Sequence, residues 1–288
     1  MKSSSLFSLT RMSLAVPLAA CIVFQCAILR APAQIITLVD NNSVAQIDVG
    51  SQQGMFYWAV LNQPNQFQNQ LNRQWFWYRV GTSGPERSID TIGAPVISGL
   101  TPGTLTSTYY DGLNRFNVGV TYSLLGGGPA SGTADITEQI AINNTSGSIL
   151  DFHFFQYSDF DIAGTPGGDT VVLSKSGFTG RINQADQFSG ANLVEVVNTP
   201  NANHGEADVV PNTLLKLNDG LATTLDDLKL SASGDAAWAL QWDVSIGVGS
   251  SFIISKDKHL GVEFVPEPGT MALLGLGFGG LLFARKRK

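Results

Sequence analysis

The chain has very little cysteine. Its 288 residues include only Cys21 and Cys26, and both lie in the apolar N-terminal segment. If that segment is removed, the mature protein has no thiol, so we expect no disulfide, cysteine nucleophile or cysteine-bound zinc. Histidine is also scarce, with three residues far apart in the sequence, and there is no Gly-x-Ser-x-Gly motif. The sequence therefore predicts no enzyme, although its many acids leave paired carboxylates for glycoside cleavage open.

Positive charge is scarce in the body of the chain. Residues 34–264 contain 10 basic and 22 acidic residues, which gives a formal charge of about −12. Nucleic acids and anionic lipid surfaces are polyanions, so such a body would be repelled by both. The composition predicts no nucleic-acid partner and favours cations as ligands or partners.

The N-terminal segment follows the plan of a secretory leader. Lys2 and Arg11 precede an apolar stretch over 12–29, and Ala31-Pro32-Ala33 forms a small-x-small cleavage site. We expect a signal peptide over 1–33, read by the general secretion machinery and cut by signal peptidase between Ala33 and Gln34. Two alternatives stay open. Leu18-Ala19-Ala20-Cys21 resembles a lipobox in which Cys21 is acylated, and the segment could also remain as an uncleaved anchor.

The body shows a hydrophobic period of two. Apolar and polar residues alternate over Phe116–Leu124 and again over Trp238–Ile246, which is typical of strands with one buried and one wet face. Similar runs elsewhere bring the count to about a dozen strands, with Gly- and Asn-rich turns between them. We expect one all-β domain over 34–264, an antiparallel β-sandwich of jelly-roll type. Weak helical patterns occur at Val209–Leu217 and Leu221–Leu230, and Asn62–Gln74 is expected to be a polar loop.

An aromatic run, Trp75-Phe76-Trp77-Tyr78, follows that polar stretch. Flat rings pack well on sugar faces, so exposed members of the run could form a platform for a saccharide. The alternation favours the other interpretation, in which the rings are buried in the core of the sandwich.

Two groups of residues could hold a metal ion. Asp159, Asp161 and Asp169 surround a glycine-rich turn and could supply the oxygen ligands that calcium prefers, although acids at turns are also common as caps. His204, Glu206 and Asp208 alternate within a predicted loop and could lie on one side of it. The alternative for His204 is a histidine that is simply solvated. We expect no other cofactor.

The C-terminal end, residues 265–288, differs from the body. Pro266-Glu267-Pro268 lies within the stretch 265–269, where two prolines prevent helix formation and sheet pairing and leave an extended backbone. Residues 270–284 then form an apolar stretch, about 22 Å long as a helix against a hydrocarbon core of about 30 Å. Four basic residues close the chain: Arg285, Lys286, Arg287 and Lys288. They predict a short transmembrane helix with its basic end in the cytoplasm.

The order of Pro-Glu-Pro, apolar helix and basic cluster resembles the PEP-CTERM sorting signal of Gram-negative bacteria. The resemblance implies that an exosortase recognises Pro266, Glu267 and Pro268 and processes the chain. It also implies bacteria that commonly make extracellular polysaccharide. The alternative is an ordinary tail anchor. The body is similar to uncharacterised β-rich ectodomains with the same signal, for example over 151–161, and no activity follows from that similarity.

Together these features predict an exported protein. We expect a precursor held transiently at the inner membrane and then sorted to the cell surface or extracellular matrix. The leading hypothesis for the body is a non-enzymatic structural or adhesive role, with extracellular polysaccharide as a candidate partner. The alternative is a carbohydrate-binding or carbohydrate-active module.

Overall fold

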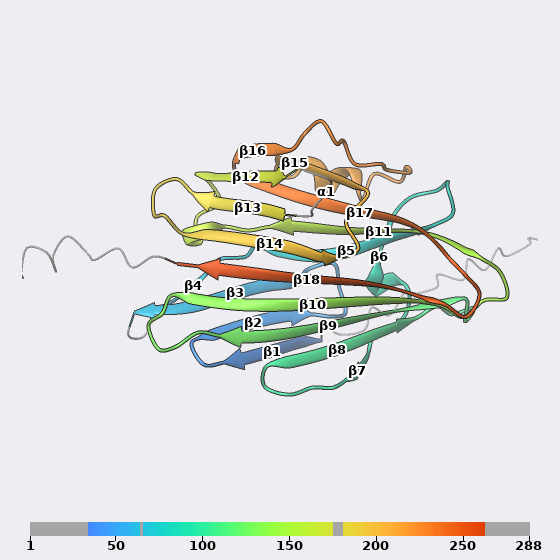
Figure 1. The fold of residues 1–288 in the computed structure, drawn as a ribbon, viewed down its shortest axis with the longest axis horizontal. Helices are drawn as coiled ribbons and strands as arrows, with labels where there is room; N and C mark the ends of the chain where they lie inside the picture. Colours follow the sequence, from blue (N-terminus) through green and yellow to red (C-terminus); the bar gives the residue numbers. More distant parts are fainter. Residues whose placement is uncertain (1–33, 64–65, 175–180, 263–288) are drawn as a thin grey trace, which may run out of the picture. The chain divides into compact units, whose positions relative to one another are not determined.

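A computed structural model describes residues 34–63, 66–174 and 181–262. Within them, strands form two sheets that pack face to face, which confirms the predicted all-β sandwich (Figure 1). No helix in these ranges is long and apolar enough to cross a membrane. The predicted signal peptide and the predicted helix over 270–284 lie outside the described residues.

The first sheet, sheet A, contains strands from both halves of the chain. All of its pairings are antiparallel except a short parallel one between β3 and β5. Its order is β1 (Ile35–Asp40), β2 (Ser43–Asp48), β3 (Gly54–Gln63), β5 (Arg73–Val80), β11 (Leu150–Asp159), β17 (Ala236–Ile246) and β15 (His204–Val209), with β4 (Gln66–Asn69) on β3 and β6 (Arg87–Ser88) on β5.

The second sheet, sheet B, is antiparallel throughout, and its strands can be followed from top to bottom in Figure 1. Its order is β16 (Ser231–Gly234), β12 (Asp169–Ser174), β13 (Arg181–Asp186), β14 (Asn192–Thr199), β18 (Ser251–Gly261), β10 (Thr133–Asn144), β9 (Phe116–Gly126), β8 (Thr104–Tyr110) and β7 (Val96–Ser98). Short helices connect strands: η1 (Ile89–Thr91), η2 (Ile162–Gly164) and α1 (Asn212–Lys216).

The predicted alternation places the core between the sheets. In β9 every second residue from Phe116 to Leu124 is buried. The ring of Phe116 lies 5.3 Å from that of Phe152 in β11 and 5.7 Å from that of Tyr78 in β5. All five tryptophans are fully buried: Trp58, Trp75, Trp77, Trp238 and Trp242. Burial of such large aromatic surfaces is the main favourable contribution to folding here.

The outer face of sheet A, the face turned away from sheet B, is only partly wet. The alternation in β17 predicts solvent-exposed Ala239 and Gln241, and this prediction is wrong because both are buried. Residues 211–230, named the cover segment here, lie over this face. They are held to it in part by the Leu225 backbone N–H, which donates to Gln241 Oε1 at 2.9 Å. Small alanine side chains in β17 leave room for this layer.

Several predicted elements need correction. Residues 62–74 are not one polar loop, because they include β4 and the start of β5. The segment around His204 is a strand, β15, rather than a loop. The helical pattern at Leu221–Leu230 forms no helix, and the one at Val209–Leu217 forms only the short α1. In each case hydrogen bonding to a neighbouring strand or loop decides the structure, and a single segment carries no signal of that partner.

Candidate functional site

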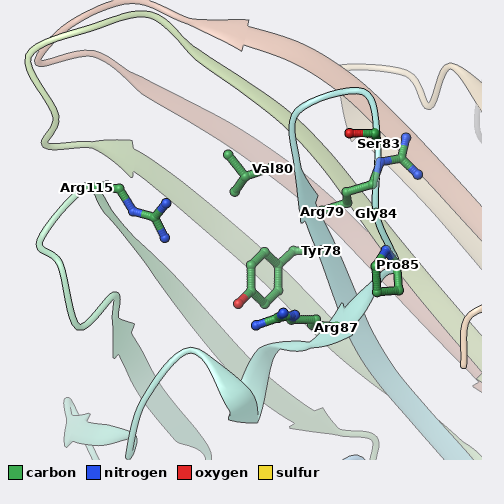
Figure 2. Close-up of a pocket in the computed structure, with 8 residues that line it drawn as sticks. All are labelled: Tyr78, Arg79, Val80, Ser83, Gly84, Pro85, Arg87 and Arg115. Carbon is green, nitrogen blue, oxygen red and sulfur yellow. The ribbon is translucent and has the colours of Figure 1, made fainter. Parts of the chain in front are cut away.

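A pocket of about 280 Å³ opens at the end of β5. It is lined by residues 78–80, the loop residues Ser83, Gly84 and Pro85, and the side chains of Arg87 and Arg115 (Figure 2). Figure 2 shows the guanidinium of Arg87 beside the hydroxyl end of the Tyr78 ring. Two cationic side chains and a phenol therefore share one opening.

The Tyr78 ring is fixed from the inner side. It stacks on Phe152 of β11, with ring centroids 5.9 Å apart and planes at 15°, and it also contacts Phe116. Burial raises the pKa of Tyr78 above its ordinary value. The hydroxyl therefore stays protonated at neutral pH and can donate a hydrogen bond.

Arg79 closes the back of the pocket and is not free to bind a ligand. It is 6% exposed and forms an ion pair with Glu86, whose side chain is buried. Arg79 also donates to the Thr223 carbonyl at 3.0 Å, and the Thr223 N–H donates to Glu86 Oε1 at 2.9 Å. This network joins the pocket loop to the cover segment.

The other two arginines differ in their partners. Arg115 donates two hydrogen bonds to Asp111, at 2.8 and 3.0 Å, and these hold the pKa of the Asp111 carboxyl below its usual value. Arg87 is exposed and forms no ion pair with any residue of the described ranges. The pocket thus carries one uncompensated positive charge on a body that is negative overall.

A row of imidazole and carboxylate groups crosses the outer face of sheet A. His153 Nδ1 lies 2.6 Å from Asp243 Oδ1, and His204 Nε2 lies 3.3 Å from Asp243 Oδ2. The row continues from His204 Nδ1 to Asp227 Oδ2 of the cover segment at 2.8 Å, and His153 Nε2 lies 3.8 Å from Asp151 Oδ2. We call these five residues the histidine–aspartate row.

The row is held by sheet register. His153 of β11 and Asp243 of β17 are direct register partners, and Arg79 of β5 is the partner of His153 on the other side, so the row begins next to the pocket. Burial raises the pKa of Asp243, but hydrogen bonds from Gln241 and His153 outweigh it and the net pKa is lowered. Asp243 is therefore an ionised acceptor between two imidazoles.

The three alternating residues of β15 lie on one side of the strand, as the spacing predicted, but they do not share a centre. His204 joins the row, Glu206 accepts two bonds from Lys216 Nζ at 2.7 Å, and Asp208 pairs with Lys229 at 2.7 Å. The interpretation of His204 as a solvated side chain is wrong, because two carboxylates hold it. No metal centre forms among these three described residues.

The acidic turn is only partly as predicted. Asp159 and Asp161 lie together, and the third member is Asp235, with one oxygen of each within 4.8 Å of the others. Asp169 instead accepts hydrogen bonds from Gln184 at 2.7 Å and from the Ile162 N–H at 3.2 Å. Burial, followed by repulsion from Asp161, raises the pKa of Asp159 to about 7. Calcium binding at this cluster stays a prediction.

The aromatic run belongs to the core. Trp75, Phe76 and Trp77 are fully buried, which leaves Tyr78 as the half-buried member at the pocket. The idea of an exposed stacking platform built from the whole run is therefore wrong. Both sides of β5 are covered, one by sheet B and the other by the cover segment, where Asn218 accepts a hydrogen bond from Trp77 at 3.3 Å.

Apart from Gln34, which is the first described residue, the terminal predictions lie outside the described ranges. They comprise the cleavage site at Ala31, Ala33 and Gln34, the motif Pro266, Glu267 and Pro268, and the basic end Arg285, Lys286, Arg287 and Lys288. The missed members of the sites on the body include Arg87, Asp227, Asp235 and Asp243. No motif marks them: Arg87 is placed by the pairing of β5 with β6, and the three aspartates are placed by segments distant in the sequence.

The fold is similar to that of known structures. A bacterial glucoamylase complexed with acarbose matches at a TM-score of 0.52 and 12% identity, over 86% of this chain and 36% of that one. The Slr1438 protein from Synechocystis matches at 0.50 and 10% identity, over 81% and 98%. A galactose mutarotase-like protein from Lactobacillus casei matches at 0.48 and 10%, over 79% and 100%. This chain thus spans about a third of the glucoamylase, and such low identities show a shared fold alone.

At the level of sequence, no curated protein matches the chain. A family model does match the C-terminal end, where the order of proline motif, apolar stretch and basic cluster predicted a sorting signal. That model is described as the PEP-CTERM protein-sorting motif. The chain therefore carries a PEP-CTERM protein-sorting motif at residues 264–288, preceded by a β-rich ectodomain.

Proposed function

We propose that this chain is an exported protein whose β-sandwich binds a saccharide bearing an anionic group, without transforming it. The PEP-CTERM motif implies export through a membrane-anchored precursor and processing by an exosortase. An adhesive protein of the cell surface or matrix needs a ligand there, and extracellular polysaccharide is the abundant candidate. This function unites the expected structural role with the expected carbohydrate-binding role.

The observation that carries the proposal is the unpaired Arg87 in the pocket beside Tyr78. A guanidinium binds carboxylate or sulfate groups through two parallel hydrogen bonds. Tyr78 adds a hydroxyl donor and part of an aromatic ring, and Pro85 adds apolar surface. The volume of about 280 Å³ is at the low end for ligand pockets and suits about one sugar ring of a longer chain.

The distribution of charge supports binding of an anionic group at the pocket, and it does not support a broad anion-binding surface. Because the body is negative, a polyanion is repelled at long range and is attracted only where a cation is unpaired. We therefore expect recognition of a single charged sugar unit at the pocket. The glucoamylase of similar fold was crystallised with acarbose, which is consistent with a saccharide ligand. The sequence identity of 12% between the two chains supports a shared fold alone.

The test is binding of the exported, processed protein to a panel of uronic-acid-containing, sulfated and neutral oligosaccharides. Arg87→Ala should weaken binding of the anionic members by about tenfold or more, the value of one charged hydrogen-bonded contact. Arg181→Ala removes an exposed arginine of β13 in sheet B and is the matched control. Equal affinity of the two variants, or preference for neutral sugars, contradicts the proposal.

The histidine–aspartate row favours a second candidate, acid–base chemistry on a saccharide. Two imidazoles share one ionised carboxylate, and His153 Nε2 is buried without a hydrogen-bond partner in the described structure. Such groups can pass a proton to and from a ligand hydroxyl. The same oligosaccharide panel, followed for release of reducing ends and for anomeric change, tests it: His153→Gln must abolish any activity found.

A further inference from the structure

Four charged side chains are completely buried between the sheets. Glu138 of β10, Glu195 of β14, and Lys256 and Lys258 of β18 all have no solvent exposure. We call them the buried quartet. They point from the middle of sheet B toward sheet A, where Gln156 of β11 lies opposite them. Two positive and two negative charges balance, which allows the group to exist in a dry interior.

Both lysines form ion pairs with both glutamates, and they differ in their contact with Gln156. Lys256 Nζ lies 2.5 Å from Glu138 Oε2 and contacts the side-chain carbonyl oxygen of Gln156. Lys258 Nζ lies 2.7 Å from Glu138 Oε1 and 3.2 Å from Glu195 Oε2, and it contacts no amide. Lys256 alone therefore combines an amine, a carboxylate base and an amide carbonyl at one point.

The orientation of the Gln156 amide is set by its other contacts. Its Nε2 lies 3.1 Å from each oxygen of Glu195 and 3.0 Å from Ser158 Oγ. An NH₂ group donates to carboxylates and a carbonyl accepts from an amine, so both ends of the amide are correctly partnered. The carbonyl faces Lys256, and the NH₂ faces Glu195.

The surroundings make deprotonation of Lys256 easier than in water. Burial lowers its pKa, and its nitrogen lies 5.0 Å from the centre of the Phe76 ring in an apolar layer. The lysines hold Glu138 ionised, with a pKa below its usual value although burial opposes this. Transfer of a proton from Lys256 to Glu138 creates two neutral groups in a medium that penalises charge.

We propose that Lys256 and Gln156 join in an intramolecular amide bond that links sheet B to sheet A. Glu138 takes a proton from the Lys256 ammonium, and the amine lone pair attacks Cδ of Gln156. The Nζ–Cδ bond forms, the Cδ–Nε2 bond breaks, and Nε2 leaves as ammonia with a proton released from Nζ, which Glu195 can pass on. An amine and a primary amide become a secondary amide and ammonia, so no oxidant or other reactant is needed.

The charge balance survives this step. Lys256 loses its positive charge, the proton that it gave remains on Glu138, and Glu195 and Lys258 remain as one ion pair at 3.2 Å. Holding the reacting groups side by side in a dry site lowers the entropic barrier to such a reaction. The body of the chain has no cysteine and so cannot join its two sheets by a disulfide. The amide link would provide a covalent bond between them.

The decisive measurement is the mass of the exported, processed protein. It should be about 17 Da below the value calculated from its termini, because one ammonia is lost. After tryptic digestion, the peptide that contains Gln156 should be joined to the peptide that contains Lys256, and trypsin should not cut after Lys256. A folded wild-type protein of unmodified mass, with a free Lys256 peptide, overturns the proposal.

Matched variants locate the reacting amine. Lys256→Arg keeps the positive charge and should lack the loss of about 17 Da, whereas Lys258→Arg, two residues away on the same face, should retain it. Glu138→Gln removes the proton acceptor and should also lack the loss. Tryptophan fluorescence establishes that each variant is folded. Persistence of the mass loss in folded Lys256→Arg would assign any link to another residue and overturn the proposal.

Discussion

Asp159 lies beside Asp161 and Asp235, and none of the three forms an ion pair with a lysine or arginine of the described residues. Burial and the neighbouring carboxylate raise the pKa of Asp159 to about 7, and burial raises that of Asp169 to about 6. Both values exceed the ordinary aspartate pKa near 4. These side chains therefore bind protons more readily in the folded protein than in the unfolded chain.

The first prediction concerns pH. Between about pH 4 and 7 the folded state binds more protons than the unfolded state at these positions, so the free energy of unfolding should fall as pH rises through that window. Asp159→Asn cannot ionise, so it should raise the melting temperature at pH 8 and flatten the pH dependence. Thermal unfolding from pH 4.5 to 8 measures this. Asp257→Asn, at an exposed position, is the control.

Calcium offers a check on the same cluster. If the carboxylates hold a cation, as the sequence predicted for Asp159 and Asp161, added calcium should raise the melting temperature at pH 8. Asp235→Asn should remove that increase. An unchanged melting temperature on titration with calcium would leave the cluster as a set of protonatable side chains.

At this scale the sequence predicted neighbours along the chain and missed neighbours across the sheet. Asp159 and Asp161 are two residues apart and were found. Asp235 directly precedes β17. It lies near Asp159 only because β17 pairs with β11. His153, Asp243 and His204 likewise come from three separate strands. Arg87 showed no signal, since an unpaired charge is recognised only once every partner has been placed.

The cover segment is the element that most changes the character of sheet A. Glu206 of β15 is fully buried beneath it and accepts hydrogen bonds from Lys216 Nζ, from Thr213 Oγ1 at 2.9 Å and from the Asp226 N–H at 2.8 Å. One carboxylate thus joins both ends of the segment to the sheet. Charge-assisted bonds of this kind are stronger when water is excluded.

The second prediction is that Glu206→Ala detaches this segment. Loss of the buried acceptor should lower the free energy of unfolding by about 3 kcal/mol, as measured by urea denaturation. Amide hydrogen exchange over 211–230 should accelerate. Asp208→Ala, two residues along the same face, breaks the pair with the exposed Lys229 and should leave stability nearly unchanged. Similar losses for both variants would contradict the anchoring role.

Elements with strong alternation were predicted well. β9 and β17 lie where the alternation over Phe116–Leu124 and Trp238–Ile246 predicted strands. β15 was missed because Gly205 and Ala207 give it little apolar contrast, and its partner β17 supplies the ordering. Gly54 shows a similar limit. It adopts φ +60°, and a Cβ there would lie 2.4 Å from the Gln74 carbonyl oxygen. The contact between β3 and β5 therefore requires glycine at this position, and no local sequence pattern reveals that requirement.

Across the whole molecule, a folded ectodomain and a sorting motif occupy separate parts of one chain. The two sheets form a single body, and the PEP-CTERM motif follows it at 264–288. The motif was recognisable from sequence because its residues are contiguous. The ligand of the body was not, because it depends on the assembled surface.

The third prediction concerns export. Replacing Pro266, Glu267 and Pro268 by alanine removes the extended recognition element, so the variant should stay in the inner membrane uncleaved. Fractionation of cells, with intact mass measured on each fraction, checks this. The ectodomain of the retained variant should still bind the same saccharides as the wild type. Normal release of the alanine variant would show that processing does not depend on the motif.

The complete burial of Trp58, Trp75, Trp77, Trp238 and Trp242 has an optical consequence. Every indole of the protein lies in an apolar environment, and the five are divided among β3, β5 and β17 of sheet A. The native emission should therefore be blue-shifted and shielded from a soluble quencher such as acrylamide. Any event that separates sheet A from its covering layers on either side will register as a red shift, without an added label.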